Sequence, residues 1–108
     1  MLNHIKMIDW ILDVEEKNIE EAEKYVDKAH RMKHEHKAAA DWCIEMARKH
    51  LDFDDKGDMM LDNLCRELSE AAGNTELLGA MRQNVHNKRA WMAEKTAKIR
   101  TMIEMYGR

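Results

Sequence analysis

The sequence predicts an all-α protein, an antiparallel bundle of three long helices with coiled-coil-like packing. The chain of 108 residues contains no proline and four glycines, and residues that favour strands are scarce. Proline removes a backbone donor and clashes with the preceding turn, so a proline-free chain suits long uninterrupted helices. Apolar residues also recur every seven positions, the repeat of helices that wrap around one another. At this length the chain is expected to form one domain, residues 1–108.

The first helix is expected over about residues 3–33, with Asn3 as its N-terminal cap. Its apolar residues lie three or four positions apart, as one face of a helix requires. Glu15 stands where the next apolar residue of this face belongs. The periodicity is lost between His30 and Lys37, which predicts a turn near residue 35. The apolar stripe consists of Ile5, Ile8, Leu12, Ile19, Ala22, Val26 and Ala29.

The second helix is expected over about residues 37–73, and the question is whether it passes through the turn-like segment 54–57. The seven-residue register is the same on both sides of that segment, which a true loop would not require, so a continuous helix is predicted. The alternative is a turn at 54–57 and a bundle of four helices. Gly73 and Asn74 are expected to end the helix. The repeat consists of Ala39, Met46, Phe53 and Met60, interleaved with Cys43, His50, Gly57 and Leu64.

The third helix is expected over about residues 75–106, with Thr75 as its cap. Its stripe is Leu78, Val85, Met92, Ile99 and Tyr106, flanked by Met81 and Met102. Two short links between three long helices imply an up-down-up bundle. Further apolar residues lie off the stripes, and we expect a homo-oligomer to bury them. These residues are Trp10, Ile11, Trp42, Met59, Leu61, Trp91 and Ile103.

Charge is distributed unevenly along the chain. Residues 1–81 contain 11 Lys and Arg against 19 Asp and Glu, and residues 82–108 contain 7 against 2, within a total net charge of −3. Two interpretations follow. Either the acidic first helix and the basic third helix neutralise each other, within the chain or across a dimer, or the basic helix binds an anion, a nucleotide or a nucleic acid. The overall acidity argues against general nucleic-acid binding, which needs a positive surface.

The two cysteines, Cys43 and Cys65, indicate a reducing compartment. They lie on the same expected helix, so at a rise of about 1.5 Å per residue they are roughly 33 Å apart and do not pair within the chain. The sequence also shows no signal peptide and no apolar run long enough to cross a membrane. A cytoplasmic protein, in the cytosol of a host cell, is therefore expected.

A buried polar layer is expected midway along the bundle. If the chain reverses near residues 35 and 74, Glu15 of the first helix lies at the same height as Asp54 or Asp55 of the second. Those aspartates in turn lie at the same height as Glu94 or Lys95 of the third helix. A buried charge is costly unless it is paired, so Glu15 and Lys95 are expected to meet, with Asp54 beside them. His50 lies about one turn away, most simply as a hydrogen-bonded core or interface histidine. Such a layer serves either to align the helices or to hold a small ligand, and both interpretations stay open.

No catalytic motif is present, so the protein is not expected to be an enzyme or to carry a cofactor. The sequence has no Gly-rich phosphate loop, nucleophile elbow, paired CxxC or HExxH. His30 and His34 are four positions apart and form a weak candidate for a metal site. A ferritin-like di-metal centre requires inward Glu-x-x-His motifs, and the chain has none.

Two segments, ADWCIEMARKHLDF at 40–53 and KTAKIRTMIE at 95–104, resemble small helical proteins encoded by bacterial viruses and prophages. The resemblance covers about half of the chain and implies a viral or prophage context, but no activity and no functional residues. Such proteins would be expected to have a histidine after Gly57. This chain has Asp58 there, which argues against a metal site shared with His50.

The first functional hypothesis is a non-enzymatic phage or prophage protein that acts by binding, as a homo-oligomer. Its partner would be a virion or host protein, or a small anionic signal molecule that it sequesters to counteract a host defence. An anion pocket needs aromatic groups for stacking and basic groups for phosphate contact. The alternatives are a structural or scaffold protein of virion assembly and, third, a metal-binding bundle. The candidate ligand-binding residues are Trp42, Arg48, Lys49, His50, Lys88, Arg89, Trp91 and Lys95.

Overall fold

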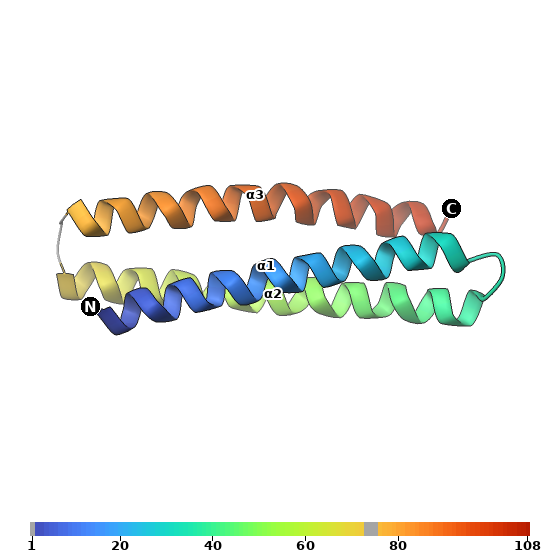
Figure 1. Ribbon diagram of the computed structural model, residues 1–108, viewed down its shortest axis with the longest axis horizontal. Helices are drawn as coiled ribbons and strands as arrows, with labels where there is room; N and C mark the ends of the chain where they lie inside the picture. The colour runs from blue at the N-terminus through green and yellow to red at the C-terminus, as the bar shows by residue number, and fades with distance from the viewer. Residues whose placement is uncertain (1, 73–75) are drawn as a thin grey trace.

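The computed structural model describes residues 2–72 and 76–108, which form three long helices in an up-down-up arrangement (Figure 1). Helix α1 spans Leu2–Met32, α2 spans Lys37–Ala72 and α3 spans Glu76–Tyr106. The molecule is a thin rod with extents of 56 × 19 × 15 Å. None of the three helices, as far as the structure describes them, has an apolar stretch that could span a bilayer.

The predicted bundle of three helices is confirmed, and so is the continuous helix through residues 54–57. The alternative with a turn there and four helices is wrong, because α2 keeps its helical backbone throughout. The first turn lies at residues 33–36, where the backbone carbonyl of Met32 accepts from the amides of Glu35 and His36. Helix α1 begins at Leu2, so Asn3 lies inside the helix and does not cap it. The stop expected at Gly73 and Asn74 and the cap expected at Thr75 lie outside the described residues.

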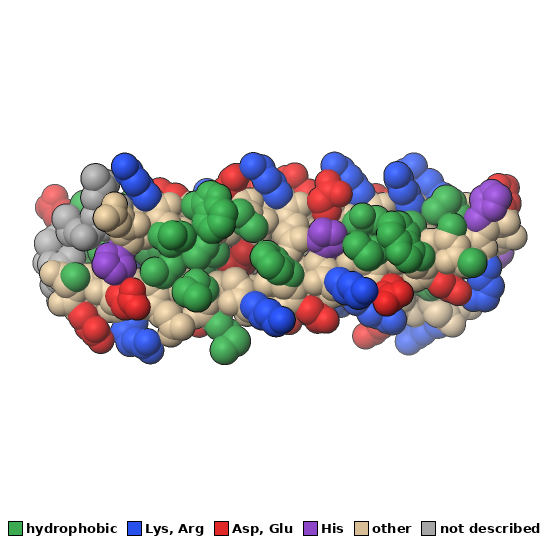
Figure 2. All heavy atoms as spheres, turned by 90° about the horizontal axis from the view of Figure 1, so that it is seen from below, with side chains coloured by type: hydrophobic (Ala, Val, Ile, Leu, Met, Phe, Trp, Pro, Cys, Tyr) green, Lys and Arg blue, Asp and Glu red, His purple; other side chains and the backbone are tan. Residues whose placement is uncertain are grey.

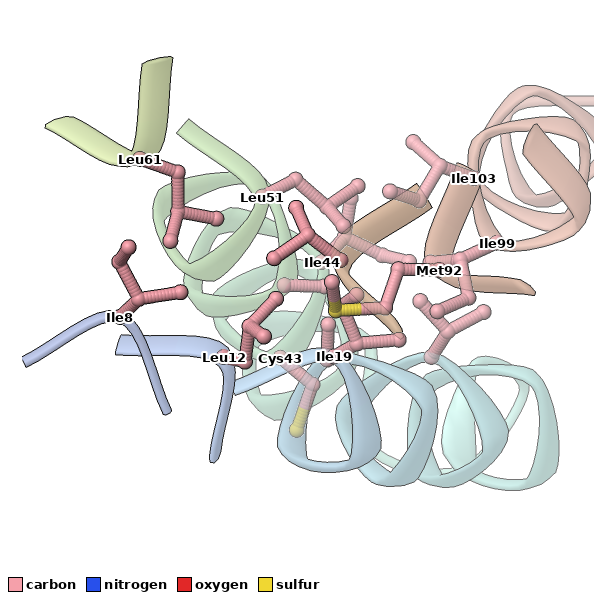
Figure 3. Packing of buried hydrophobic residues seen from close by; sticks show 14 of the residues in the cluster. Ile8, Leu12, Ile19, Cys43, Ile44, Leu51, Leu61, Met92, Ile99 and Ile103 are labelled. Carbon is pink, nitrogen blue, oxygen red and sulfur yellow. The ribbon is translucent and has the colours of Figure 1, made fainter. Parts of the chain in front are cut away.

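The predicted stripe of α1 forms the centre of the core. Apart from the half-buried Ile5, its members are at most 2% exposed. Glu15 interrupts this stripe and is itself only 2% exposed. Figure 3 shows Ile8, Leu12 and Ile19 of α1 together with Cys43, Ile44 and Leu51 of α2.

Of the two rows predicted for α2, the row that contains Cys43 is buried or half-buried, whereas the row from Ala39 to Met60 is displaced by one position from the buried one. Ala39, Phe53 and Met60 are exposed, and the buried repeat comprises Ala40, Ala47, Asp54, Leu61 and Leu68. Leu61 was expected off the stripe and is fully buried. Helix α2 has apolar residues on two adjacent faces, and a seven-residue period fits both of them. The period therefore identifies the helix, but which face is buried depends on the packing against α1.

The predicted stripe of α3 is largely confirmed. Leu78, Val85, Met92 and Ile99 are buried, whereas Tyr106 is half-buried. Ile103, expected off the stripe, is buried as well, because α3 presents a face wider than one seven-residue row to α1 and α2.

Basic side chains of α3 pair with acidic side chains of the other two helices. Arg89 reaches Asp62 at 2.6 Å in α2, and Lys95 reaches Glu23 at 3.1 Å in α1. At the far end of the rod, the Tyr106 hydroxyl donates to Asp41 at 2.6 Å, and this bond raises the pKa of Tyr106 to about 12. The pair of Lys95 with Glu23 fits the expected neutralisation between the first and third helices, whereas Arg89 and Arg100 pair with α2.

The packing predicts a clear difference between two leucines. Leu61 is fully buried between the helices, whereas Leu77 is 52% exposed. We expect Leu61→Ala to lower the free energy of unfolding by about 2–5 kcal/mol, because it leaves a cavity in the core. The matched Leu77→Ala is expected to change it by no more than about 0.5 kcal/mol. Chemical denaturation followed by circular dichroism measures both, and equal losses would contradict the assigned faces.

Candidate functional site

The centre of the molecule is the place where the Glu15 side chain crosses from α1 to α2. Glu15 lies against Gly57, and a Cβ atom placed on Gly57 would be 3.0 Å from Oε1 of Glu15. A glycine inside a helix costs about 1 kcal/mol relative to alanine. Here its missing side chain leaves the space that the Glu15 carboxyl occupies, which explains a glycine in the middle of α2.

Asp54 lies beside Glu15 and is only 5% exposed. Asn18 of α1 donates from its carboxamide nitrogen to Oδ1 of Asp54 and to the backbone carbonyl of His50, both at 2.8 Å. Nδ1 of His50 lies within hydrogen-bond distance of Oδ1 of Asn18. Because a carboxamide oxygen only accepts, the imidazole is the donor. Asn18 therefore links α1 to two residues of α2.

His50 is a hydrogen-bonded histidine at the seam between α1 and α2, as expected from its place beside the apolar stripe. Its ring stacks on Tyr25 with 5.5 Å between the ring centres, and Tyr25 contacts Trp42 edge-on at 5.7 Å. These contacts hold the imidazole in the seam together with its bond to Asn18.

Two oxygens of the acid pair are left without a hydrogen bond. Oε1 of Glu15 and Oδ2 of Asp54 are buried and have no partner in the structure. Burial raises the pKa of Glu15 to about 9, and hydrogen bonding to the Asp58 carboxyl adds to the shift. Burial also raises the pKa of Asp54 to about 6, against the opposing effect of the bond from Asn18. Both carboxyls therefore hold a proton more tightly than they do in the unfolded chain.

A cavity of about 430 Å³ adjoins this acid pair. All three helices contribute to it: α1 through Glu15 and Ile19, α2 through three aspartates, and α3 through one of its faces. The α3 face is made of small or apolar side chains with an arginine at each end. The lining residues are Glu15, Ile19, Asp54, Asp55, Asp58, Arg89, Met92, Ala93, Thr96, Ala97 and Arg100.

The expected polar layer is partly confirmed and partly wrong. Glu15 and Asp54 are buried side by side, as predicted, but Lys95 does not join them. Its ammonium group binds Glu23 at 3.1 Å and lies 5.7 Å from the centre of the Trp91 ring. The expected meeting of Glu15 and Lys95 depended on the register across two successive turns, and small offsets at each turn add up between α1 and α3.

The candidate anion-binding residues do not converge on one pocket of the chain. Lys49 and His50 line a cavity of about 350 Å³ with Asn18, Met46 and Phe53, all from α1 and α2. Two basic candidates of α3 form ion pairs elsewhere: Arg89 binds Asp62, and Lys95 binds Glu23. The other candidates, Trp42, Arg48, Lys88 and Trp91, are exposed.

The two weak metal candidates are not arranged as a metal site. Nε2 of His30 bonds to the backbone carbonyl of Met102 at 2.8 Å, and its ring contacts Tyr106 edge-on. His34 is exposed in the turn after α1. Across residues 2–72 and 76–108, no group of three His, Cys, Asp or Glu side chains is placed to hold a metal ion.

An apolar face covers the side of α1 and α2 that lies away from α3. Trp10 is 62% exposed, Phe53 56% and Met60 50%. With Ile11 and Val14 they line a groove of about 270 Å³, to which Glu15, Lys56 and Gly57 also contribute. Figure 2 views the molecule from this side and shows hydrophobic side chains gathered along it. We call the surface formed by Trp10, Ile11, Val14, Phe53 and Met60 the apolar face.

Sequence reasoning missed several residues of this region. Asn18 and Asp58 gave no signal, because a polar residue on a charged helix is not distinctive. Phe53 and Met60 were placed in the core. A second seven-residue row, from Ala40 through Asp54 to Leu68, was visible in the sequence and would have identified Leu61 as buried.

The raised pKa of Glu15 predicts a pH-dependent stability. Between its ordinary value of 4.5 and about 9, the folded chain binds more protons at Glu15 than the unfolded chain, so this group lowers the free energy of unfolding as pH rises. We expect Glu15→Met to be more stable than the wild type by about 1–3 kcal/mol near pH 8, with a smaller difference near pH 4.5. Urea unfolding at several pH values measures this difference. The exposed Glu20→Met is the control, and a Glu15→Met variant that is less stable at every pH would contradict the account.

The contact between Glu15 and Gly57 predicts coupling between the two positions. In a Glu15→Ala background, Gly57→Ala is expected to raise the free energy of unfolding by about 0.5–1 kcal/mol, the gain in helix propensity. With Glu15 present, the new methyl group contacts the Glu15 carboxyl. The same Gly57→Ala change is then expected to raise the free energy of unfolding by less, or to lower it. A double-mutant cycle from denaturation curves measures the coupling. Equal effects in both backgrounds would show that the contact is not tight.

The chain matches no protein-family model, no curated protein and no solved structure. The site is therefore described by its own residues: a buried acid pair with an adjoining cavity, and an apolar face on the other side of the same two helices.

Proposed function

We propose that the protein is a non-enzymatic binding protein that acts as a homo-oligomer, with the apolar face of one copy packed on the same face of another. The observation that supports this proposal is the exposure of Trp10, Phe53 and Met60 on one side of the α1–α2 pair. Contiguous exposed apolar patches mark interaction sites in proteins of this size, because water contact with them is unfavourable. Aromatic and methionine side chains are also the types enriched at the centres of interfaces.

A second copy suits this face for geometric reasons. The face is formed by residues 10–14 of α1 and 53–60 of α2, so its occupant must present an apolar patch of similar extent. The same face of another copy presents such a patch. Helix α3 covers the opposite side, so two copies would bury their apolar faces in one closed, two-fold interface.

A protein partner and a small anionic molecule are not equally supported as ligands of this chain. Arg89, Lys95 and Arg100 are each paired with a carboxylate, and Lys88 and Lys98, which form no ion pair among the described residues, lie exposed and line none of the cavities described above. Contact with protein is therefore better supported than sequestration of a small anionic molecule. Because the chain resembles small phage and prophage proteins, we propose that any partner other than a second copy is a virion or host protein. Counteraction of a host defence is part of this proposal.

The proposal predicts a discrete oligomer that depends on the apolar face. Native mass spectrometry and light scattering on untagged protein are expected to give a dimer or a multiple of it. We expect Phe53→Ser combined with Met60→Ser to weaken association by at least about tenfold, while circular dichroism shows unchanged helix content. Leu77→Ser combined with Met105→Ser, both exposed residues of α3, is the matched control.

Three outcomes bear on the proposal. A wild type that is monomeric at high micromolar concentration would contradict it. Equal loss of association in the α3 control would place the interface elsewhere. Open-ended assemblies that grow with concentration would favour the alternative, a scaffold protein of virion assembly, because a two-fold interface closes on itself.

A further inference from the structure

Among the described residues, no basic side chain forms an ion pair with the acid pair at the centre of the bundle, although the nearby charge of Arg89 partly offsets the raised pKa of Glu15. Glu15 is 2% exposed and Asp54 is 5% exposed, and each has one carboxyl oxygen without a hydrogen bond. Buried carboxyls are normally paired or hydrogen-bonded, because removing them from water is costly. Both residues line the same cavity of about 430 Å³. The arrangement is that of a site with room for a cation.

The two arginines that also line this cavity are bound to other carboxylates. Arg89 reaches Asp62 at 2.6 Å and Asp58 at 4.0 Å. Arg100 reaches Asp55 at 3.4 Å. The guanidinium groups thus bind the outer acids. Arg89 still acts on Glu15 through its charge, but neither arginine forms an ion pair with Glu15 or Asp54.

The chemistry of the cavity favours an organic cation over a metal ion. The described part of the chain contains no group of three side chains placed to hold a metal. Besides its acids, the cavity is lined by Ile19, Met92 and Ala93, which suit methylene groups. A primary ammonium group has three N–H donors and can satisfy two carboxyl oxygens at once.

We propose that this cavity binds a small organic cation of the alkyl diamine or polyamine class. Its ammonium group binds Glu15 and Asp54, and its methylene chain packs on Ile19, Met92 and Ala93. The cavity takes residues from all three helices, whereas the apolar face belongs to α1 and α2. This inference therefore goes beyond the proposed function and does not require a second copy.

Binding of an ammonium group is linked to release of a proton. Burial, the hydrogen bond with Asp58 and the charges of Asp58 and Asp54 raise the pKa of Glu15 to about 9, against the opposing charge of Arg89. The Glu15 carboxyl is therefore protonated near neutral pH when no cation is bound. The incoming ammonium keeps its three protons and stabilises the carboxylate, and the Glu15 proton passes to the solvent. A cation held by exposed charges alone would release no proton.

Isothermal titration calorimetry with 1,4-diaminobutane and with spermidine tests the proposal on the full-length protein. Titrations near pH 7.5, at constant ionic strength, in two buffers of different ionisation enthalpy report both affinity and proton release. We expect saturable binding of one molecule per chain with release of up to one proton. Glu15→Gln and Asp54→Asn are each expected to weaken binding by at least about tenfold, and Glu15→Gln is expected to abolish the proton release.

Asp52→Asn is the matched control, since Asp52 is exposed on α2, does not line the cavity and carries the same charge. It is expected to bind as the wild type does. Absence of binding by both amines would overturn the proposal, as would an equal loss in Asp52→Asn or equal heats with MgCl2 in place of the amine. Circular dichroism and light scattering on the same samples report fold and oligomeric state separately, so failure here is distinguishable from failure of the proposed function.

Discussion

The contact between Glu15 of α1 and Gly57 of α2 determines the structure of the middle of the bundle. A carboxyl in an otherwise apolar stripe needs space, and a glycine on the facing helix provides it at a place where a Cβ atom would lie 3.0 Å from Oε1 of Glu15. Because Asn18 binds Asp54 and His50 from the same stretch of α1, the two helices are aligned by polar contacts in addition to apolar ones. In the turn-like segment 54–57, Asp54 and Gly57 face α1, and the segment is helical.

The α1–α2 pair has two faces with different roles. One is covered by α3 through Val85, Met92 and Ile99, and its charged rim is neutralised by pairs such as Arg89 with Asp62. Exposed ion pairs contribute little to stability, so α3 is held mainly by its buried stripe. The other face keeps large apolar side chains in water. A thin bundle of three helices cannot bury both, and this asymmetry is the basis for proposing association between copies.

The acid pair connects the stability of the fold with the proposed cation site. Glu15 and Asp54 destabilise the fold when ionised, and their partnerless oxygens make the same position suited to a cation. Binding that relieves a buried charge is coupled to protonation and to folding, because all three act on the same carboxyls. Apolar residues at positions 15 and 54 would make the core more stable. The two acids therefore lower the stability of the fold next to the cavity.

The sequence by itself determined the helices of this protein. Lack of proline and a seven-residue apolar repeat are local properties of the chain, so three helices, a continuous α2 and the burial of Glu15 and Asp54 were all predictable. Tertiary structure decided which faces meet. Phe53 and Met60 have the spacing of core residues but lie outside, and Lys95 binds Glu23 in place of Glu15. The physical reason is that periodicity is a property of one helix, whereas the buried face and the register depend on the relative rotation and displacement of two.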